Sequence, residues 1–175
     1  MTQYETMDRN ERLILGIDPG FGRMGYAVLA AAGNDLHLIA CDAIMTPMAL
    51  SYPRRLQRIY EQLSEIIAEY QPAEAAIEAL FFGKNVTTAI AVAQARGVVI
   101  LTLAQRELSI AEYTPSAVKL AVTGYGAARK EQVGFMVCQW LHLPAVPKPD
   151  DAADAAAIAI CHAHMLHPNM VGALK

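Results

Sequence analysis

A short apolar segment near the start of the chain ends in a carboxylate and is followed by a turn. The segment is LILGID, residues 13–18, and Pro19 and Gly20 come directly after it. Four of its first five residues are large and apolar, which predicts a buried strand over Leu13–Asp18. Proline and glycine in succession favour a turn. The sequence therefore predicts a fold in which a rigid, buried strand holds an acidic side chain at its tip.

Hydrophobic periodicity predicts alternating strands and helices after this first strand. Further strands are predicted over residues 25–31, 36–44, 74–80 and 108–113, with hairpin-turn residues at 33–35. Helices are predicted from a Ser51 cap to Gln71, and over residues 85–104, 115–122, 129–141 and 150–166. This order predicts an α/β fold with a mixed five-stranded sheet flanked by helices. Three strands would form an antiparallel meander, and two parallel strands would complete the sheet.

Composition excludes two broad classes of protein. Hydrophobic residues make up 54% of the 175 and charged residues 18%, which is too apolar for a disordered chain. The apolar run at residues 97–104, interrupted by Thr102, is far shorter than the ~20 residues of a membrane-spanning helix. The polar N-terminus has no apolar signal core. We therefore expect a cytoplasmic protein without membrane association. Its expected parts are a flexible leader at 1–12, one domain over 13–167 and a flexible tail at 168–175.

Four acidic residues occupy positions that a sheet and a helix can bring together. Asp18 ends the first predicted strand and Glu78 stands near the end of the fourth. Asp151 and Asp154 open the last predicted helix, three residues apart and so on one face. If the first and fourth strands are neighbours, the four carboxylates meet at one edge of the sheet. Such oxygens suit Mg²⁺ or Mn²⁺, and two such ions can bind the attacking and leaving oxygens in phosphoryl transfer.

Each of these acids also has an ordinary structural explanation. An aspartate before Pro-Gly commonly forms a turn. Acids at a helix start, such as Asp150 and Asp151, commonly cap it and face its positive end. Glu78 is harder to explain in this way, because a buried glutamate without a partner is rare. From the residues alone, the four-acid metal site and the structural explanations both stay open.

Four segments of the chain together carry a family resemblance: ILGIDPG with GYAV, AIEALFFGKN, AVAQARGVV and KPDDAADAAAIAICHAH. In this order and spacing, from about residue 13 to residue 164, they resemble the bacterial RuvC Holliday-junction resolvases, which have a ribonuclease-H-like fold. The resemblance implies an endonuclease of recombination and DNA repair that resolves four-way DNA junctions by paired symmetric nicks. It also implies a homodimer, Mg²⁺ or Mn²⁺ at two ions per active site, and the bacterial branch-migration motor complex as a partner.

The resemblance places the family's four metal-binding and catalytic acids at Asp18, Glu78, Asp151 and Asp154. The register D-A-A-D-A leaves Asp150 as a neighbour of the ligands. Asp18 is then expected to bridge both ions, while Glu78 and Asp154 each complete one coordination sphere. Asp151 is expected to be a ligand or the base for the attacking water.

The same resemblance suggests DNA contacts and a catalytic lysine. Phe81 matches a family aromatic that stacks on DNA near the crossover, and the alternative for it is packing beneath its own loop. Lys119 and Lys130 match basic positions of DNA contact and catalysis, and Lys130 is expected to stabilise leaving-group or transition-state charge. Lys84 is a further DNA-contact candidate. Lesser candidates, more commonly solvated surface charges, are Arg96, Arg129 and Lys148.

Two further features leave open questions. The helix predicted over 85–104 has small residues at alternate positions from Ala89 to Gly97, which suit close packing with a partner helix or equally with its own sheet. His164 follows Asp154 by ten residues, nearly three helical turns, so we expect it at the surface or at the helix end and away from the ions.

The net charge of −3 argues against nucleic-acid binding only when the acids are counted without their cations. Three other functions fit the sequence less well. A sugar-kinase or actin-like ATP binder generally needs two such domains, and 175 residues supply one. A catalytically silent junction-binding relative would not need all four acids. Ribonuclease H fits the GIDPG start and the DAADA segment less well.

Overall fold

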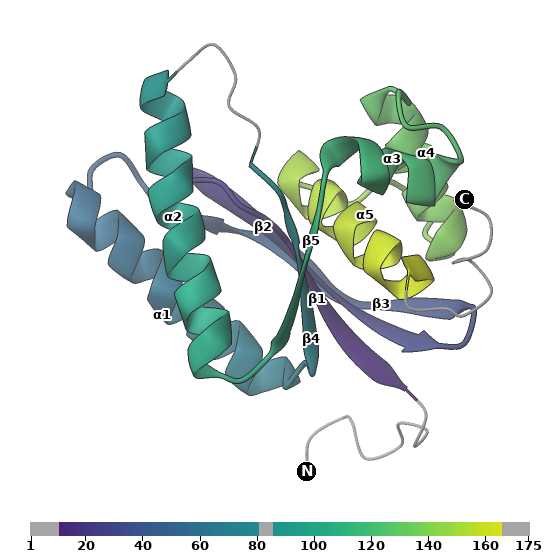
Figure 1. Ribbon diagram of the computed structural model, residues 1–175, viewed down its shortest axis with the longest axis horizontal. Helices are drawn as coiled ribbons and strands as arrows, with labels where there is room; N and C mark the ends of the chain where they lie inside the picture. The colour runs from purple at the N-terminus through teal and green to yellow at the C-terminus, as the bar shows by residue number, and fades with distance from the viewer. Residues whose placement is uncertain (1–10, 81–85, 166–175) are drawn as a thin grey trace.

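The computed structural model describes residues 11–80 and 86–165, and it has a five-stranded sheet with helices on both faces (Figure 1). The strand order is β3-β2-β1-β4-β5. β1 pairs antiparallel with β2, and β2 antiparallel with β3; β4 is parallel to both β1 and β5. The predicted α/β architecture is confirmed, and the first and fourth strands are neighbours, which is the condition on which a meeting of the carboxylates depends.

Every predicted element is present in the predicted order, with ends shifted by at most two residues. The strands are β1 (Arg12–Asp18), β2 (Arg23–Ala32), β3 (Asp35–Met45), β4 (Glu74–Glu78) and β5 (Ser109–Tyr113). The helices are α1 (Tyr52–Tyr70), α2 (Val86–Gln105), α3 (Pro115–Thr123), α4 (Lys130–Trp140) and α5 (Asp150–Met165). No helix in the described part of the chain is long and apolar enough to cross a membrane.

The expected domain ends fall largely beyond what the structure describes. Residues 1–10 of the expected leader and all of the expected tail lie outside the described residues, and β1 already begins at Arg12. Ser51 does occupy the N-cap position of α1, although its side chain makes no capping hydrogen bond. Gly33 has a φ of 61° in the β2–β3 turn, a conformation that glycine adopts without strain.

Each face of the sheet packs on its own set of helices. Alternate residues of a strand point to opposite faces, so Leu15 and Ile17 of β1 pack with α1 and α2, while Ile14 packs with α3, α4 and α5. All three side chains are fully buried. The continuous apolar run of β1 therefore follows from burial on both faces, and it fixes Asp18 at the end of a strand that is packed on both sides.

The alanine-rich helix α5 lies very close to the sheet. A Cβ added to Gly25 of β2 would lie 1.9 Å from the carbonyl oxygen of Asp151, and one on Gly16 of β1 would lie 2.2 Å from that of Ala155. Only glycine at these strand positions allows so close an approach. The two glycines thus bring the first turns of α5 directly over the strand end that carries Asp18.

Candidate active site

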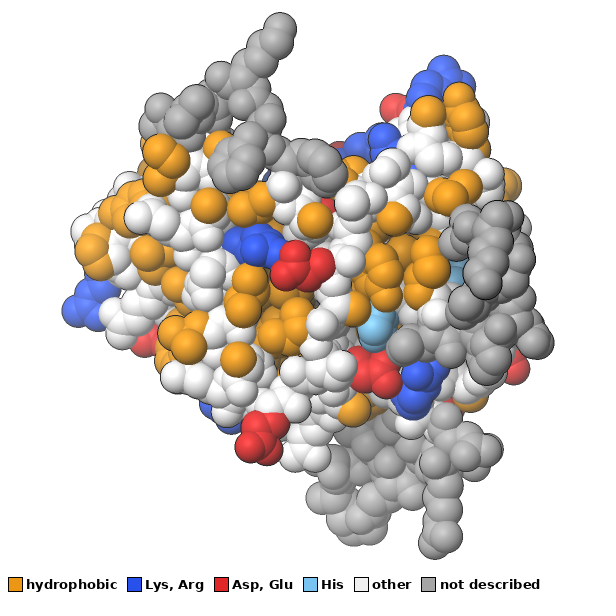
Figure 2. All heavy atoms as spheres, in the orientation of Figure 1, with side chains coloured by type: hydrophobic (Ala, Val, Ile, Leu, Met, Phe, Trp, Pro, Cys, Tyr) orange, Lys and Arg blue, Asp and Glu red, His pale blue; other side chains and the backbone are white. Residues whose placement is uncertain are grey.

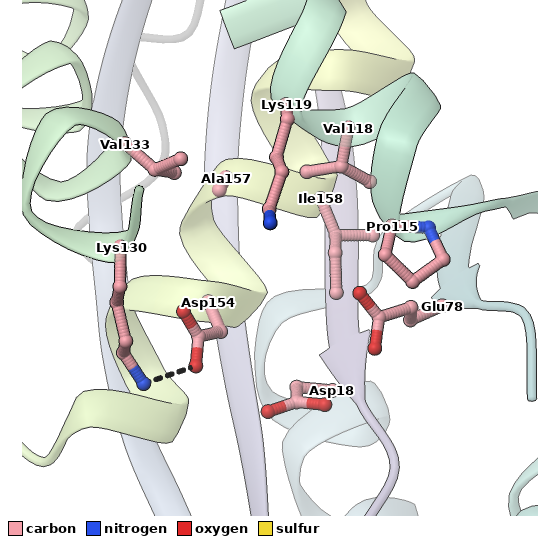
Figure 3. A pocket seen from close by; sticks show the side chains of 10 residues that line it. All are labelled: Asp18, Glu78, Pro115, Val118, Lys119, Lys130, Val133, Asp154, Ala157 and Ile158. Carbon is pink, nitrogen blue, oxygen red and sulfur yellow. Dashed lines mark hydrogen bonds and ion pairs between the residues drawn. The ribbon is translucent and has the colours of Figure 1, made fainter. Parts of the chain in front are cut away.

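Three of the four predicted acids line one pocket at the edge of the sheet. Asp18 ends β1 and Glu78 ends the neighbouring β4, where Ile17 pairs with Ile77 in parallel register. Asp154 reaches the same pocket from α5, and Figure 3 shows the three carboxylates around a common space. The pocket has a volume of about 220 Å³, enough for a phosphate group and several waters. Segments 60 residues or more apart in the sequence thus meet here.

Two lysines also line this pocket. Lys119 comes from α3 and Lys130 from the first turn of α4, and their side chains enter from the helical wall (Figure 3). Lys130 Nζ donates a hydrogen bond to Asp154 Oδ2 at 2.8 Å and lies 3.8 Å from Asp150 Oδ2. The hydrogen bond to Asp154 is the main reason that the pKa of Lys130 is raised. Lys130 is therefore a fixed positive charge at the acidic pocket.

Asp151, the fourth acid, lies beside the pocket and is not part of its lining. Its carboxylate forms an ion pair with Arg23, the first residue of β2. Asp151 still raises the pKa of Asp18 through its charge, so it belongs to the same electrostatic cluster. The sequence placed Asp151 with the other three acids but gave no sign of the Arg23 partner, because the two residues are more than 120 positions apart.

The carboxylates make it costly for one another to ionise. Burial, followed by the charges of Glu78, Asp154 and Asp151, raises the pKa of Asp18 to about 7. Burial and then the charge of Asp154 raise the pKa of Glu78, while Lys119 lowers it. A raised carboxyl pKa means that the negative charge is stabilised less well in the protein than in water. Binding of a cation in this pocket would therefore be favourable.

The donor set fits a divalent cation. Within residues 11–80 and 86–165, no three His, Cys, Asp or Glu side chains stand close enough to hold a metal ion between them as they are. The carboxylates instead face a shared pocket from its walls, and their oxygens are the donors that Mg²⁺ and Mn²⁺ prefer. The raised pKa values of Asp18 and Glu78 show charge that such a cation would neutralise.

The other predicted contact residues have different outcomes. Phe81 and Lys84 lie outside the described residues, between β4 and α2. Arg96 is mostly buried and pairs with Glu112 of β5 at 2.5 Å, which ties α2 to the sheet. Lys148 pairs with Asp150 at 2.8 Å.

A chain of hydrogen-bonded polar side chains that was not predicted from the sequence links β5, α5 and β4. The Tyr113 hydroxyl lies 2.8 Å from His162 Nδ1, and His162 Nε2 lies 3.0 Å from Glu74 Oε2. His164 lies in the last turn of α5, as expected, but the surface alternative is wrong because it is buried against Trp140. The absence of charged residues from 155 to 165 is the signal for burial around this stretch of α5.

Comparisons with known proteins agree with this geometry. A family model described as crossover junction endodeoxyribonuclease RuvC matches residues 14–162. A relative of that name from Roseiflexus sp. (strain RS-1) is 53% identical over 150 residues, which cover 86% of this chain and 89% of the relative. Another from Heliobacterium modesticaldum is 53% identical over 154 residues, covering 88% of this chain and 95% of the relative.

Solved structures share the fold over nearly the whole chain. The RuvC of T. thermophilus in complex with a Holliday junction substrate superposes with a TM-score of 0.84 at 32% identity, covering 88% of this chain and 94% of that one. The yeast mitochondrial Holliday junction resolvase, at 14% identity and a TM-score of 0.63, shares the fold; the match covers 93% of this chain and 86% of that one. The chain therefore belongs to the crossover junction endodeoxyribonuclease RuvC family.

Proposed function

We propose that this chain is a structure-selective endonuclease that resolves four-way DNA junctions by paired symmetric nicks in recombination and DNA repair. The observation that carries the proposal is the pocket in which carboxylates from β1, β4 and α5 face two lysines. The T. thermophilus relative, which has the same fold, was solved with a Holliday junction bound. Such a pocket suits the hydrolysis of a phosphodiester, because its carboxylates can bind metal ions and its lysines can bind phosphate oxygens.

The proposed chemistry divides between the acids and the lysines. Asp18, Glu78 and Asp154, with Asp151 beside them, would hold Mg²⁺ or Mn²⁺, two ions per site. Such ions supply positive charge to the attacking and leaving oxygens of the phosphodiester. Lys119 would bind a phosphate oxygen. Lys130 would orient Asp154 through their hydrogen bond and add positive charge where the transition state becomes more negative.

A second copy of the chain is part of this proposal, because two symmetric nicks need two active sites related by a two-fold axis. Helix α2 has two distinct faces. Ala95, Val99 and Leu103 are fully buried against the chain's own sheet. Ile90 and Leu101 are more than half exposed, at 54% and 56%.

The exposed face of α2 is the proposed dimer contact. Ile90, Gln94, Gly97 and Leu101 recur at helical spacing along it. A Cβ added to Gly97 would meet no atom of the described residues within 4 Å, so a partner helix has room to approach closely there. Figure 2 shows hydrophobic side chains over α1 and α2 with few charged ones among them. Packing on the chain's own sheet accounts for the face with Ala95, and contact with a partner helix is the proposal for the face with Gly97.

Cytoplasmic localisation and partnership with the branch-migration motor complex complete the proposal. Both rest on the family resemblance alone. Phe81 and Lys84, which lie outside the described residues, keep their proposed role as DNA contacts on the same basis.

Nicking of a synthetic four-way junction, compared with linear duplex of the same sequence, tests the proposed function. In magnesium we expect rapid nicking of the junction, little nicking of the duplex, and no nicking by Asp18→Asn. Equal cutting of junction and duplex would contradict junction selectivity.

A matched pair of variants tests the assignment of the acids. Asp154→Asn should abolish nicking, because Asp154 lines the pocket. Asp150→Asn should retain most of it, because Asp150 is a half-exposed neighbour that contacts Lys148 and Lys130. The same loss in both variants would show that the register of the two ligands on α5 is wrong.

A further inference from the structure

An unassigned cluster of cationic and aromatic side chains lies where α1 begins. We define the arginine–aromatic strip as Phe21, Tyr52, Arg54, Arg55 and Arg58. Phe21 lies in the loop between β1 and β2, and the other four belong to the first two turns of α1. We propose that this strip binds the phosphate backbone of a duplex arm of the junction. This inference rests on the proposed function and assigns it a second, separate contact surface.

The strip is continuous with the active-site edge. Phe21 follows Asp18 by three residues, and Thr46 N donates to Gly22 O at 3.0 Å, which fixes that loop to the segment after β3. Arg23, the residue after Gly22, pairs with Asp151 of the site. DNA that leaves the pocket along this edge of the sheet therefore meets the strip next.

The aromatic part of the strip is held in place. Phe21 stacks on Tyr52 with 4.4 Å between ring centroids, and the Arg55 guanidinium lies 3.9 Å from the centre of the Phe21 ring. Arg55 Nε also donates to Thr46 Oγ1 at 3.1 Å. The Tyr52 hydroxyl donates to Gln94 of α2. These contacts fix the loop beside Asp18 and present Arg55 in a defined orientation.

The charge of the strip is not neutralised by an acid of the described residues. Among the described residues none of Arg54, Arg55 and Arg58 forms an ion pair with an acid, whereas Arg12, Arg23, Arg96, Lys130 and Lys148 all do. Arg54 is exposed and donates to the Gln57 amide oxygen at 2.7 Å, and Arg58 Nε donates to the carbonyl of Met45, also at 2.7 Å.

Helix stability does not explain these arginines. The first turn of α1 contains no acid, and cations near the start of a helix face its positive end, which is unfavourable. The three arginines lie within five consecutive positions, and none of them pairs with a described acid. They therefore form a local positive surface on a chain whose net charge is −3. Unpaired guanidinium groups bind phosphate oxygens well, so the strip fits a polyanion and fits poorly against a second copy of its own positive face.

The expected contact is to the DNA backbone and not to bases. Phosphate contacts position a duplex without reading its sequence. They also release counterions, so each lost contact lowers the slope of log affinity against log salt concentration by about 1. The strip should therefore strengthen binding of all junctions, whatever the sequence of their arms.

Salt-dependent binding of a labelled four-way junction tests the inference, in an Asp18→Asn background so that the DNA stays uncut. We expect Arg54→Gln to weaken binding by about three- to tenfold and to lower the salt slope by about 1. Arg54→Lys should keep most of the slope. Arg106→Gln is the matched control, because Arg106 is exposed at the opposite edge of the sheet, after α2 and before β5.

Three outcomes would overturn the inference. One is an equal affinity and slope for Arg54→Gln and Arg106→Gln. Another is a change in oligomeric state with Arg54→Gln, which would make the strip a protein interface. The third is a loss of affinity in Arg54→Gln that stays the same when the junction arms are shortened stepwise. A contact to an arm must be lost once the arm is too short to reach the strip.

The two proposals fail in different ways. If the strip is unimportant, the protein without substitutions still nicks four-way junctions in preference to duplex. If the proposed function is wrong, that preference is absent whatever residue stands at position 54.

Discussion

At the scale of single residues, the site concentrates negative charge that the protein itself only partly balances. Asp18 is the centre of this cluster, with a pKa raised to about 7 by burial and then by Glu78, Asp154 and Asp151. Lys130 and Arg23 each engage one acid of the cluster, Asp154 and Asp151 respectively. The free energy that this crowding costs the folded protein is what a bound cation would recover.

Replacing Asp18 by asparagine should therefore stabilise the protein when metal is absent. In chelator at pH 7.5 we expect Asp18→Asn to raise the free energy of unfolding by about 1–3 kcal/mol, because it removes a poorly compensated charge. Added magnesium should then raise the melting temperature of the unsubstituted protein more than that of the variant. Thermal unfolding in chelator and in magnesium measures both effects. If magnesium raises the melting temperature of the variant as much as that of the unsubstituted protein, Asp18 is not a ligand.

His162 predicts a dependence of stability on pH. Burial lowers its pKa below the ordinary value of 6.5, and the Glu74 charge opposes this shift. Neutral His162 therefore contributes stability that is fully present above pH 6.5 and is lost as the pH falls through the lower pKa of the folded state. Glu74, Arg12, Tyr113 and Cys161 are the titratable or charged groups around it.

The corresponding variant is His162→Gln, which leaves Glu74 and Tyr113 without their shared partner. We expect it to lower the free energy of unfolding by about 1–3 kcal/mol at pH 8, and by less at pH 5.5. Urea unfolding at the two pH values measures the difference. His37→Gln, on an exposed position of β3, is the control and should change little. A difference in unfolding free energy between the variant and the unsubstituted protein that is larger at pH 5.5 than at pH 8 would contradict a neutral, buried His162.

At the scale of elements, the close contact of α5 with β1 and β2 places two of the acids. Gly25→Ala would put a methyl group within van der Waals overlap of the Asp151 carbonyl and force α5 away from the sheet. We expect a loss of about 2–4 kcal/mol in unfolding free energy and a large loss of nicking. Urea unfolding and the junction assay measure these effects.

Gly22→Ala is the control for this variant. A Cβ there meets only the Arg55 guanidinium at 3.6 Å, an ordinary contact. A stable, active Gly25→Ala protein would show that α5 does not depend on this close approach.

The sequence was sufficient for the elements but not for the contacts between them. β1 and Asp18 were predictable because an apolar run on a doubly covered strand has no polar positions before its end. The residues Gly16 and Gly25 gave no such signal, because their role depends on a helix more than 120 residues away. The pairing of Arg23 with Asp151 and the burial of His162 likewise arise only when distant segments pack together.

At the scale of the whole molecule, the distribution of charge and apolar surface decides how the chain meets its partners. The net charge of −3 is a sum over an acidic pocket, whose charge a cation would neutralise, and a group of arginines that form no ion pair with a described acid. The exposed face of α2 adds an apolar surface on which a second copy would complete a two-fold assembly.

Leu101→Lys tests the dimer. Leu101 is 56% exposed on α2, so a lysine there should leave the fold intact while placing two charges at the proposed contact. We expect the variant to sediment as a monomer at concentrations where the unsubstituted protein is a dimer. Met48→Lys is the control, because Met48 is 91% exposed outside that face. A dimer that survives Leu101→Lys would remove α2 as the interface.

The most direct measurement is the nicking of a four-way junction as magnesium is titrated from zero, with the positions of the cuts mapped on all four strands. We expect no cutting in chelator, a rise with magnesium steeper than first order, and nicks at symmetric positions on two opposed strands. Undiminished cutting in chelator would contradict the claim that the carboxylates of β1, β4 and α5 act together through bound cations.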